Sequence, residues 1–228
     1  MFLFKKPVQL IDLTQTLHPD IPTWDGGCGF RSHTELDYSD GCLVKRYDCV
    51  AGVGTHMDAP SHFFSEGKDI ASLATQDLVA PAAVIHLSEK IHSNYFLSVQ
   101  DILNDEKEHG KIQKGNFVFV STGWDQYWNE PERYRNDLHF PGISSDAAEL
   151  LLEREIIGIG IDTLSPDGSN VAFPVHHLLL GSGKTIIENL TSLDRLPMRG
   201  AHIFALPSKV KGGAEAPVRV IGVVPLEH

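Results

Sequence analysis

Two histidines and one aspartate occur within a seven-residue stretch of the sequence, at His56, Asp58 and His62. Two glycines precede them, and Pro60 disfavours a helix and biases the residue before it towards extended geometry. In an extended chain the three polar side chains would share one face, with neighbours roughly 6–7 Å apart. Groups at this spacing can bind one divalent metal ion, with water as its remaining ligand. A polar turn with surface histidines is the alternative, but the glycines, the proline and the third polar group favour a metal site.

A second group of polar residues lies in the far half of the chain. His176 adjoins an apolar stretch, and Glu188, twelve residues later, ends another. Because an isolated buried charge is costly, such a glutamate must be paired, protonated or bound to a metal ion. An ion pair or a hydrogen bond to nearby backbone would satisfy it equally well. The sequence by itself gives no reason for these two residues to lie beside His56 and Asp58.

Three aromatic residues are candidates for the wall of a binding pocket. Trp24 lies in a loop rich in proline and glycine, Phe63 directly follows His62, and Trp124 follows a predicted strand. An aromatic wall would suit an aryl substrate, whereas core packing would account for each side chain equally well. We therefore name these three as the candidate substrate-binding residues.

The pattern of apolar residues predicts many strands and few helices. Helices are expected at residues 98–104, capped by Ser98, and from Ser144 onward. The strand expected at residues 43–50 leads directly into the stretch with His56, which would place the polar side chains at the end of a rigid element. Strands are expected at residues 8–13, 43–50, 82–87, 117–120, 156–161, 185–188, 203–206 and 218–224. These elements predict a mixed α/β fold.

Length and composition limit the class of protein. The 228 residues predict one domain, residues 1–228, in which residues 226–228 are typical of a tag remnant. A formal charge of −11 argues against a nucleic acid or an anionic membrane as partner, and no apolar stretch is long enough to span a bilayer. The three cysteines lack C-x-x-C spacing, which favours a reducing compartment and hence the cytoplasm.

The first polar stretch resembles the signature of the cyclase family of metal hydrolases, which includes bacterial kynurenine formamidases and isatin hydrolases. That signature reads His-x-Gly-Thr-His-x-Asp-x-Pro-x-His. The positions that match it are Gly54, Thr55, His56, Asp58, Pro60 and His62. Residues 11–14, 122–124, 160–163 and 176–188 also look like family landmarks in family order, so the resemblance covers nearly the whole chain.

The resemblance implies a site, a cofactor and a fold. His56, Asp58, His176 and Glu188 would be metal ligands, and His62 would be the general acid/base. The metal would be zinc or manganese, the substrate a small molecule, and the fold a swivelling β/β/α domain. The family usually assembles as homodimers or homotetramers.

One position departs from the family signature. The first signature histidine, itself a metal ligand, falls at Gly52 in this sequence. The site would therefore hold one ion instead of two, unless another residue replaces the missing ligand. The candidates for that replacement are Cys28, His33, Asp48 and Cys49.

The expected reaction is metal-assisted hydrolysis of a carbon–nitrogen bond in an amide such as an aryl formamide. The ion would lower the pKa of bound water and polarise the carbonyl, while His62 would move the proton to the departing nitrogen. One alternative is a hydrolase of cyclic amides, of the isatin type, or of lactones. Another is a non-catalytic protein of the family that binds a metal or a small molecule.

Overall fold

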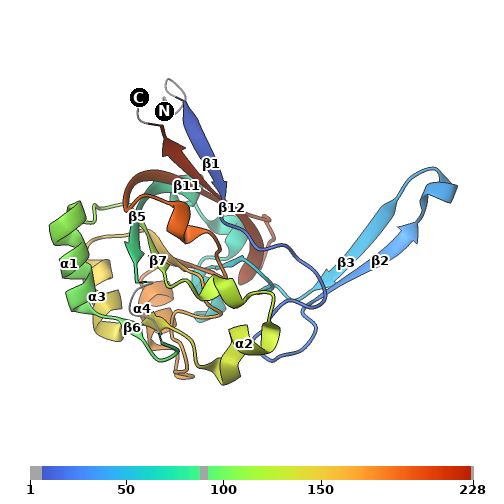
Figure 1. Cartoon of the computed structure of the whole chain (residues 1–228). Helices are drawn as coiled ribbons and strands as arrows, with labels where there is room; N and C mark the ends of the chain where they lie inside the picture. Colours follow the sequence, from blue (N-terminus) through green and yellow to red (C-terminus); the bar gives the residue numbers. More distant parts are fainter. Residues whose placement is uncertain (1–6, 88–91, 227–228) are drawn as a thin grey trace.

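The computed structural model describes residues 7–87 and 92–226, and its centre is a sheet that closes on itself (Figure 1). Most of the predicted tag remnant, at residues 227 and 228, lies outside the described residues. Strand order in the sheet is β1-β12-β11-β5-β7-β9-β10-β4, and β4 also pairs with β12, so the last seven strands of this order form a barrel. Its strands are β1 (Val8–Asp12), β4 (His56–Asp58), β5 (Val79–His86), β7 (Phe117–Ser121), β9 (Gly158–Ile161), β10 (Thr185–Glu188), β11 (Arg199–Pro207) and β12 (Glu215–Pro225).

Parallel and antiparallel pairing divide the barrel. Strands β5, β7, β9 and β10 run parallel to one another, and the remaining pairings are antiparallel. Along β7, Phe117 and Phe119 enter one apolar cluster, whereas Val118 and Val120 enter another. Because successive side chains of a strand point to opposite faces, β7 separates the barrel interior from a helical layer.

The helical layer consists of α1 (Val99–His109), α3 (Ser145–Glu153) and α4 (Pro174–Gly181). Their buried side chains pack on the outer face of the parallel strands, and Figure 1 shows the three helices on one side of the barrel. A short helix, α2 (Pro131–Arg135), belongs to a third apolar cluster that contains Trp124 and Tyr134. A small pair of strands, β6 (Phe96–Leu97) and β8 (Gly142–Ile143), completes the body.

Within the described part of the chain, strands β2 (Phe30–Leu36) and β3 (Val44–Cys49) pair only with each other, and they project away from the barrel as an arm (Figure 1). Every residue of β3 is exposed, and Phe30 is the one buried residue of β2. The strand predicted at residues 43–50 is therefore present, but it does not belong to the rigid element that positions His56.

The mixed α/β prediction is confirmed. Several helices and strands also lie where local sequence patterns predicted them. Ser98 caps α1 in a capping box with Asp101, as predicted, although the helix continues to His109. The strand predicted at residues 156–161 is present as β9, and its glycines allow close packing, because a Cβ on Gly160 would lie only 2.7 Å from the Phe119 ring. Among the described residues, no helix is both long and apolar enough to cross a membrane.

Two predicted strand boundaries at prolines are wrong. Pro81 lies inside β5, where the register with β11 is interrupted between Arg199 and His202, an irregularity that accommodates a residue without an N–H. Strand β12 begins at Glu215 instead of after Pro217, since its first three residues pair with β4. A proline signal alone shows neither the bulge nor the second pairing partner.

Candidate metal centre

Strand β4 carries the first polar stretch into the seam of the barrel. His56 and Asp58 are buried and share one face, while Met57 between them points into the apolar core. The predicted extended chain is therefore confirmed from His56 to Asp58 but is wrong for His62, which lies in the 3-10 turn Pro60–His62. Proline is tolerated at the first position of a helical turn, where its missing N–H has no partner to lose.

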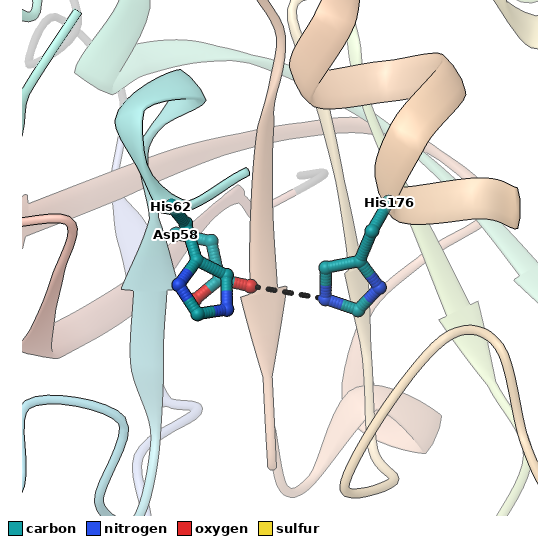
Figure 2. A group of neighbouring side chains, drawn as sticks. All are labelled: Asp58, His62 and His176. Carbon is teal, nitrogen blue, oxygen red and sulfur yellow. Dashed lines mark ion pairs between the residues drawn. The ribbon is translucent and has the colours of Figure 1, made fainter. Parts of the chain in front are cut away.

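The register across β4 brings Glu188 to the same face. In the antiparallel pairing of β10 with β4, Glu188 lies opposite His56 and Ile186 lies opposite Asp58. Residues directly opposite each other in such a pair project to the same side. On the helical side, α4 places His176 over this face, so Figure 2 shows His176 facing Asp58 and His62 from across β10.

Each buried histidine has one ring nitrogen engaged away from the centre. Nδ1 of His56 lies 2.9 Å from the carbonyl oxygen of Gly54, to which it must donate. Nδ1 of His176 lies 2.5 Å from an Asp167 carboxylate oxygen, and Asp167 also accepts from the backbone N–H groups of Val175 and His176. Both rings therefore present Nε2 to the centre, the arrangement that outer carboxylates and carbonyls impose on metal-binding histidines.

The two Nε2 atoms and the two carboxylates lie within ligand distance of one another. His56 Nε2 is 3.5 Å from Asp58 Oδ1 and 3.3 Å from Glu188 Oε2. His176 Nε2 is 3.5 Å from Asp58 Oδ2, the pair dashed in Figure 2, and 3.3 Å from Glu188 Oε1. Two ligands each about 2.1 Å from a tetrahedral ion are about 3.4 Å apart. The spacing therefore fits a bound cation.

Buried oxygens without partners give a second test of this fit. Both carboxylate oxygens of Asp58 and Oε1 of Glu188 are buried, and none accepts a hydrogen bond. Such atoms are rare in folded proteins unless a water or an ion is their partner. Two imidazoles and two carboxylates are a donor set that zinc and manganese both accept. The residues present thus fit a divalent metal ion.

Charges around the centre shift the pKa values of its histidines. Burial alone would lower the pKa of His56, but the hydrogen bond to Glu188 and the charge of Asp58 outweigh it and raise the pKa to about 10. Burial of His176 is likewise outweighed by the hydrogen bond to Asp167 and by the nearby carboxylates of Asp58 and Glu188, and its pKa rises to about 12. Burial and the charge of Asp58 raise the pKa of Glu215. In the metal-free protein, protons on the two histidines therefore supply the positive charge that a metal ion would otherwise supply.

Metal binding is expected to release protons and to strengthen as pH rises. At neutral pH in the metal-free protein, both imidazoles carry a second ring proton and hence a positive charge. Each must lose that second proton to bind a metal ion. The apparent affinity should increase by about a hundredfold per pH unit between pH 6 and 8, one factor of ten for each of the two protons displaced. Calorimetric titration with Zn²⁺ in two buffers of different ionisation enthalpy counts the protons released. Equal heats in both buffers would contradict the expectation.

Replacement of Asp167 by asparagine is expected to weaken metal binding without removing a ligand. The variant keeps the size of the side chain but loses the charge that holds Nδ1 of His176. Loss of such an outer partner typically lowers metal affinity by about 10–100-fold. Competition with a zinc chelator measures the change, and Asp146→Asn, at the exposed first turn of α3, is the matched control. Equal affinity in both variants would show that Asp167 serves only as a helix cap.

A cavity of about 400 Å³ opens onto the centre, a size within the usual range for small-molecule sites. Its residues are Trp24, Gly52, His56, Asp58, His62, Phe63, Leu164, Ser165, Phe173, His176, Glu188, Asn189 and Glu215. Phe173 contacts Trp24 and Phe63, at ring-centre distances of 5.5 and 5.7 Å, and the three rings form one wall. Trp24 and Phe63 therefore both line the cavity.

Trp124 does not line this cavity. Its indole N–H donates to the carbonyl oxygen of Tyr134, and the side chain packs in the third apolar cluster. The candidates for the ligand missing at position 52 do not line it either: Cys28, His33, Asp48 and Cys49 are all exposed, in the arm or beside it. Trp124 and the four candidate replacement ligands therefore all lie away from the metal centre.

Sequence reasoning missed three residues that the structure brings to the site. No sequence pattern assigned a role to Asp167 or Phe173. Glu215 lies outside the strand predicted at residues 218–224, yet it lies opposite Asp58 in the pairing of β12 with β4. The one local sign of Glu215 is an acidic residue at the start of an otherwise apolar strand, the same sign that singled out Glu188.

Sequence comparison places the chain among known hydrolases. The Cyclase family model matches residues 11–168, more than half of the chain. Isatin hydrolase from Roseibium aggregatum is 33% identical over 250 residues, which cover 98% of this chain and 94% of the relative. Kynurenine formamidase from Bacillus cereus is 29% identical over 226 residues, which cover 95% of this chain and 98% of the relative.

Solved structures agree with the sequence match. Isatin hydrolase A from Ralstonia solanacearum has a TM-score of 0.88 and 30% identity, covering 95% of this chain and 92% of its own. A potential metal-dependent hydrolase with cyclase activity has a TM-score of 0.78 and 26% identity, covering 97% and 100%. The family expected from the signature is thus confirmed despite Gly52. The chain belongs to the cyclase family of metal-dependent hydrolases.

Proposed function

We propose that this protein hydrolyses a carbon–nitrogen bond in a small aryl amide, such as an aryl formamide, with zinc or manganese as its metal. One observation carries the proposal: unpartnered oxygens of Asp58 and Glu188 and Nε2 atoms of His56 and His176 meet beside an aromatic-walled cavity. The kynurenine formamidase relative supports an open-chain amide substrate. A divalent ion at these ligands would supply Lewis-acid polarisation of the carbonyl and a nucleophilic water at neutral pH.

The chain itself would orient the substrate and move the proton. Rings of Trp24, Phe63 and Phe173 form a flat apolar wall for the aryl group. His62 stands at the rim with its side chain 31% exposed, and its Nδ1 is 3.6 Å from Glu215 Oε2. With Nδ1 turned towards this carboxylate, Nε2 is free to take a proton from the attacking water. It then returns the proton to the nitrogen as the carbon–nitrogen bond breaks.

A cyclic amide is the second candidate substrate, because the isatin hydrolase relative is 33% identical over nearly all of this chain. Opening a cyclic amide uses the same attack and the same proton transfer, but both products of the cleavage stay in one molecule. The cavity volume does not favour one substrate over the other.

Hydrolysis of N-formylkynurenine, isatin and simple aryl amides by the metal-loaded protein tests the proposal. We expect turnover of at least one of these amides, and its loss after chelation with restoration by added Zn²⁺ or Mn²⁺. The ratio of kcat/KM values between the formamide and isatin decides between the two substrates. Tight binding without turnover on the whole panel would instead identify a non-catalytic binding protein.

We also propose that the protein acts as a homo-oligomer in the cytoplasm. The arm supports assembly, because an isolated two-stranded sheet is at best marginally stable and this one exposes apolar side chains along its length. Those side chains are Leu36, Leu43, Val44 and Tyr47. The arm also carries both charge signs, which allows it to pair with a second copy of itself. Three unpaired cysteines support a reducing compartment.

Charging the arm is expected to dissociate the oligomer. The double substitution Val44→Lys and Tyr47→Lys removes two exposed apolar side chains and adds repulsion between copies. Sedimentation equilibrium at micromolar concentration should show a dimer or tetramer for the unaltered protein and a monomer for the variant. Leu103→Lys, at an equally exposed leucine on α1, is the control that should not dissociate. A monomeric unaltered protein would refute the proposal.

A further inference from the structure

Strand β4 has a carboxylate on both sides. Glu188 of β10 lies opposite His56, and Glu215 of β12 lies opposite Asp58. Side chains directly opposite in an antiparallel pair project from the same face, about 4.5–5.5 Å apart at their Cβ atoms. The closure of the barrel at β4 therefore sets Glu215 beside the metal centre, with the last strand of the chain as its support.

The carboxylate of Glu215 faces two histidines of the metal centre, one with each oxygen. Its Oε1 is 4.0 Å from His56 Nε2 and its Oε2 is 3.6 Å from His62 Nδ1. Ligand atoms of His56, Asp58 and Glu215 all lie within 4.8 Å of one another. Ligand atoms of Asp58, His62 and His176 form a second cluster of this kind. Asp58 belongs to both clusters, and its two unpartnered oxygens face opposite ways, Oδ1 to His56 and Oδ2 to His176.

Gly52 leaves the space that Glu215 fills. A Cβ built on Gly52 would collide with Glu215 Oε1 and would lie 3.3 Å from His56 Nε2, so a side chain at this position would point into the centre. The backbone itself does not require glycine, because Gly52 is not among the residues of positive φ. Position 52 and Glu215 therefore compete for one volume at the metal centre.

We propose that Glu215 is a metal ligand that takes the place of a side chain at position 52, so that the protein binds two divalent ions bridged by Asp58. One ion would be held by His56, Asp58 and Glu215, and the other by Asp58, His176 and Glu188. The first set has one nitrogen and two carboxylates, whereas a histidine at position 52 would give two nitrogens and one carboxylate. Carboxylate-rich sets suit Mn²⁺ better than nitrogen-rich sets do.

The inference rests on the divalent-metal chemistry of the proposed function, but it is tested by metal binding and not by hydrolysis. The variants are Glu215→Ala, Gly52→His and the double variant Gly52→His with Glu215→Ala. Each is loaded with Mn²⁺, desalted and assayed for ions per chain by elemental analysis, with circular dichroism as the check on folding. Electron paramagnetic resonance distinguishes a coupled pair of Mn²⁺ ions from a single isolated one.

We expect two ions in the unaltered protein and one in Glu215→Ala, with the coupled signal replaced by that of isolated Mn²⁺. The second ion should bind more than about a hundredfold more weakly, beyond the loss that an outer partner causes. The double variant should regain the second ion and bind Zn²⁺ over Mn²⁺ by a larger ratio than the unaltered protein does.

Two results would overturn the inference. A second ion retained by Glu215→Ala with unchanged affinity would show that the glutamate is not a ligand. One ion per chain in the unaltered protein, with hydrolysis intact, would show that the second subsite does not exist and would leave the proposed function standing. Hydrolysis absent from a protein that binds two ions would leave the Glu215 assignment standing and refute the proposed function instead.

Discussion

Asp58→Asn is expected to abolish metal binding and, with it, hydrolysis. Asp58, like Glu188, sets one carboxylate oxygen towards each buried histidine, and neither oxygen of Asp58 accepts a hydrogen bond. An amide retains the shape but loses the charge and one acceptor, so neither ion position keeps its ligand set. A loss of several kcal/mol of transition-state stabilisation corresponds to a decrease in kcat/KM of about 10³-fold or more.

Elemental analysis of desalted Asp58→Asn measures the first effect, and kcat/KM on the substrate of the unaltered protein measures the second. The control is Asp48→Asn, an exposed aspartate of the arm, which should change neither. The close approach of His176 and the charges of the nearby histidines outweigh burial and lower the pKa of Asp58, so its charge also stabilises the metal-free fold. That stabilisation is present above the unfolded pKa of aspartate and is lost as pH falls through the lowered folded value. Full metal content in the variant would contradict the ligand assignment.

His62→Ala is expected to keep its metal and lose turnover. His62 lies on the turn after β4, at the rim of the cavity, where its ring packs edge-on against Phe63. As the general acid/base, it would contribute at least about a hundredfold to kcat. His177→Ala is the matched control, because its exposed ring also packs edge-on against Phe63 but does not line the cavity.

Metal content separates the two roles open to His62. Its ring nitrogen lies within ligand range of Asp58 and His176, so the side chain is placed to bind an ion as well as to move a proton. A variant with full metal content and low kcat supports the proton role, and an unchanged kcat removes His62 from the mechanism. Loss of metal together with activity would make His62 a ligand.

Local sequence patterns predicted those parts of the site that depend on neighbours in the chain. His56 and Asp58 share a face because side chains alternate in any strand, and that alternation can be read from two residues and a proline. The same rule failed at His62, because a proline that excludes the interior of a helix is acceptable at the start of a turn. His176 and Glu188 were assigned only by resemblance to the family, and the structure brings both to the centre.

The other residues of the site come together through pairing between strands that are distant in the sequence. Local sequence patterns do not predict such pairing. Glu215 reaches the centre only because β12 pairs with β4, and it precedes the strand predicted at residues 218–224. Trp24 and Trp124 both pack in the third apolar cluster, but Trp24 is partly exposed and also lines the cavity, whereas Trp124 does not. Aromatic composition predicts a wall but does not distinguish these two fates.

The three-residue strand β4 also has a consequence for the order of events during folding. Its partners are β10 and β12, so the ligands gather only when residues 185–188 and 215–225 have both reached residues 56–58. Contacts between residues so far apart in the chain form slowly, after local helices and hairpins. An apoprotein would therefore capture its cation at the end of folding. The rate at which a refolding chain takes up metal then reports when the barrel closes.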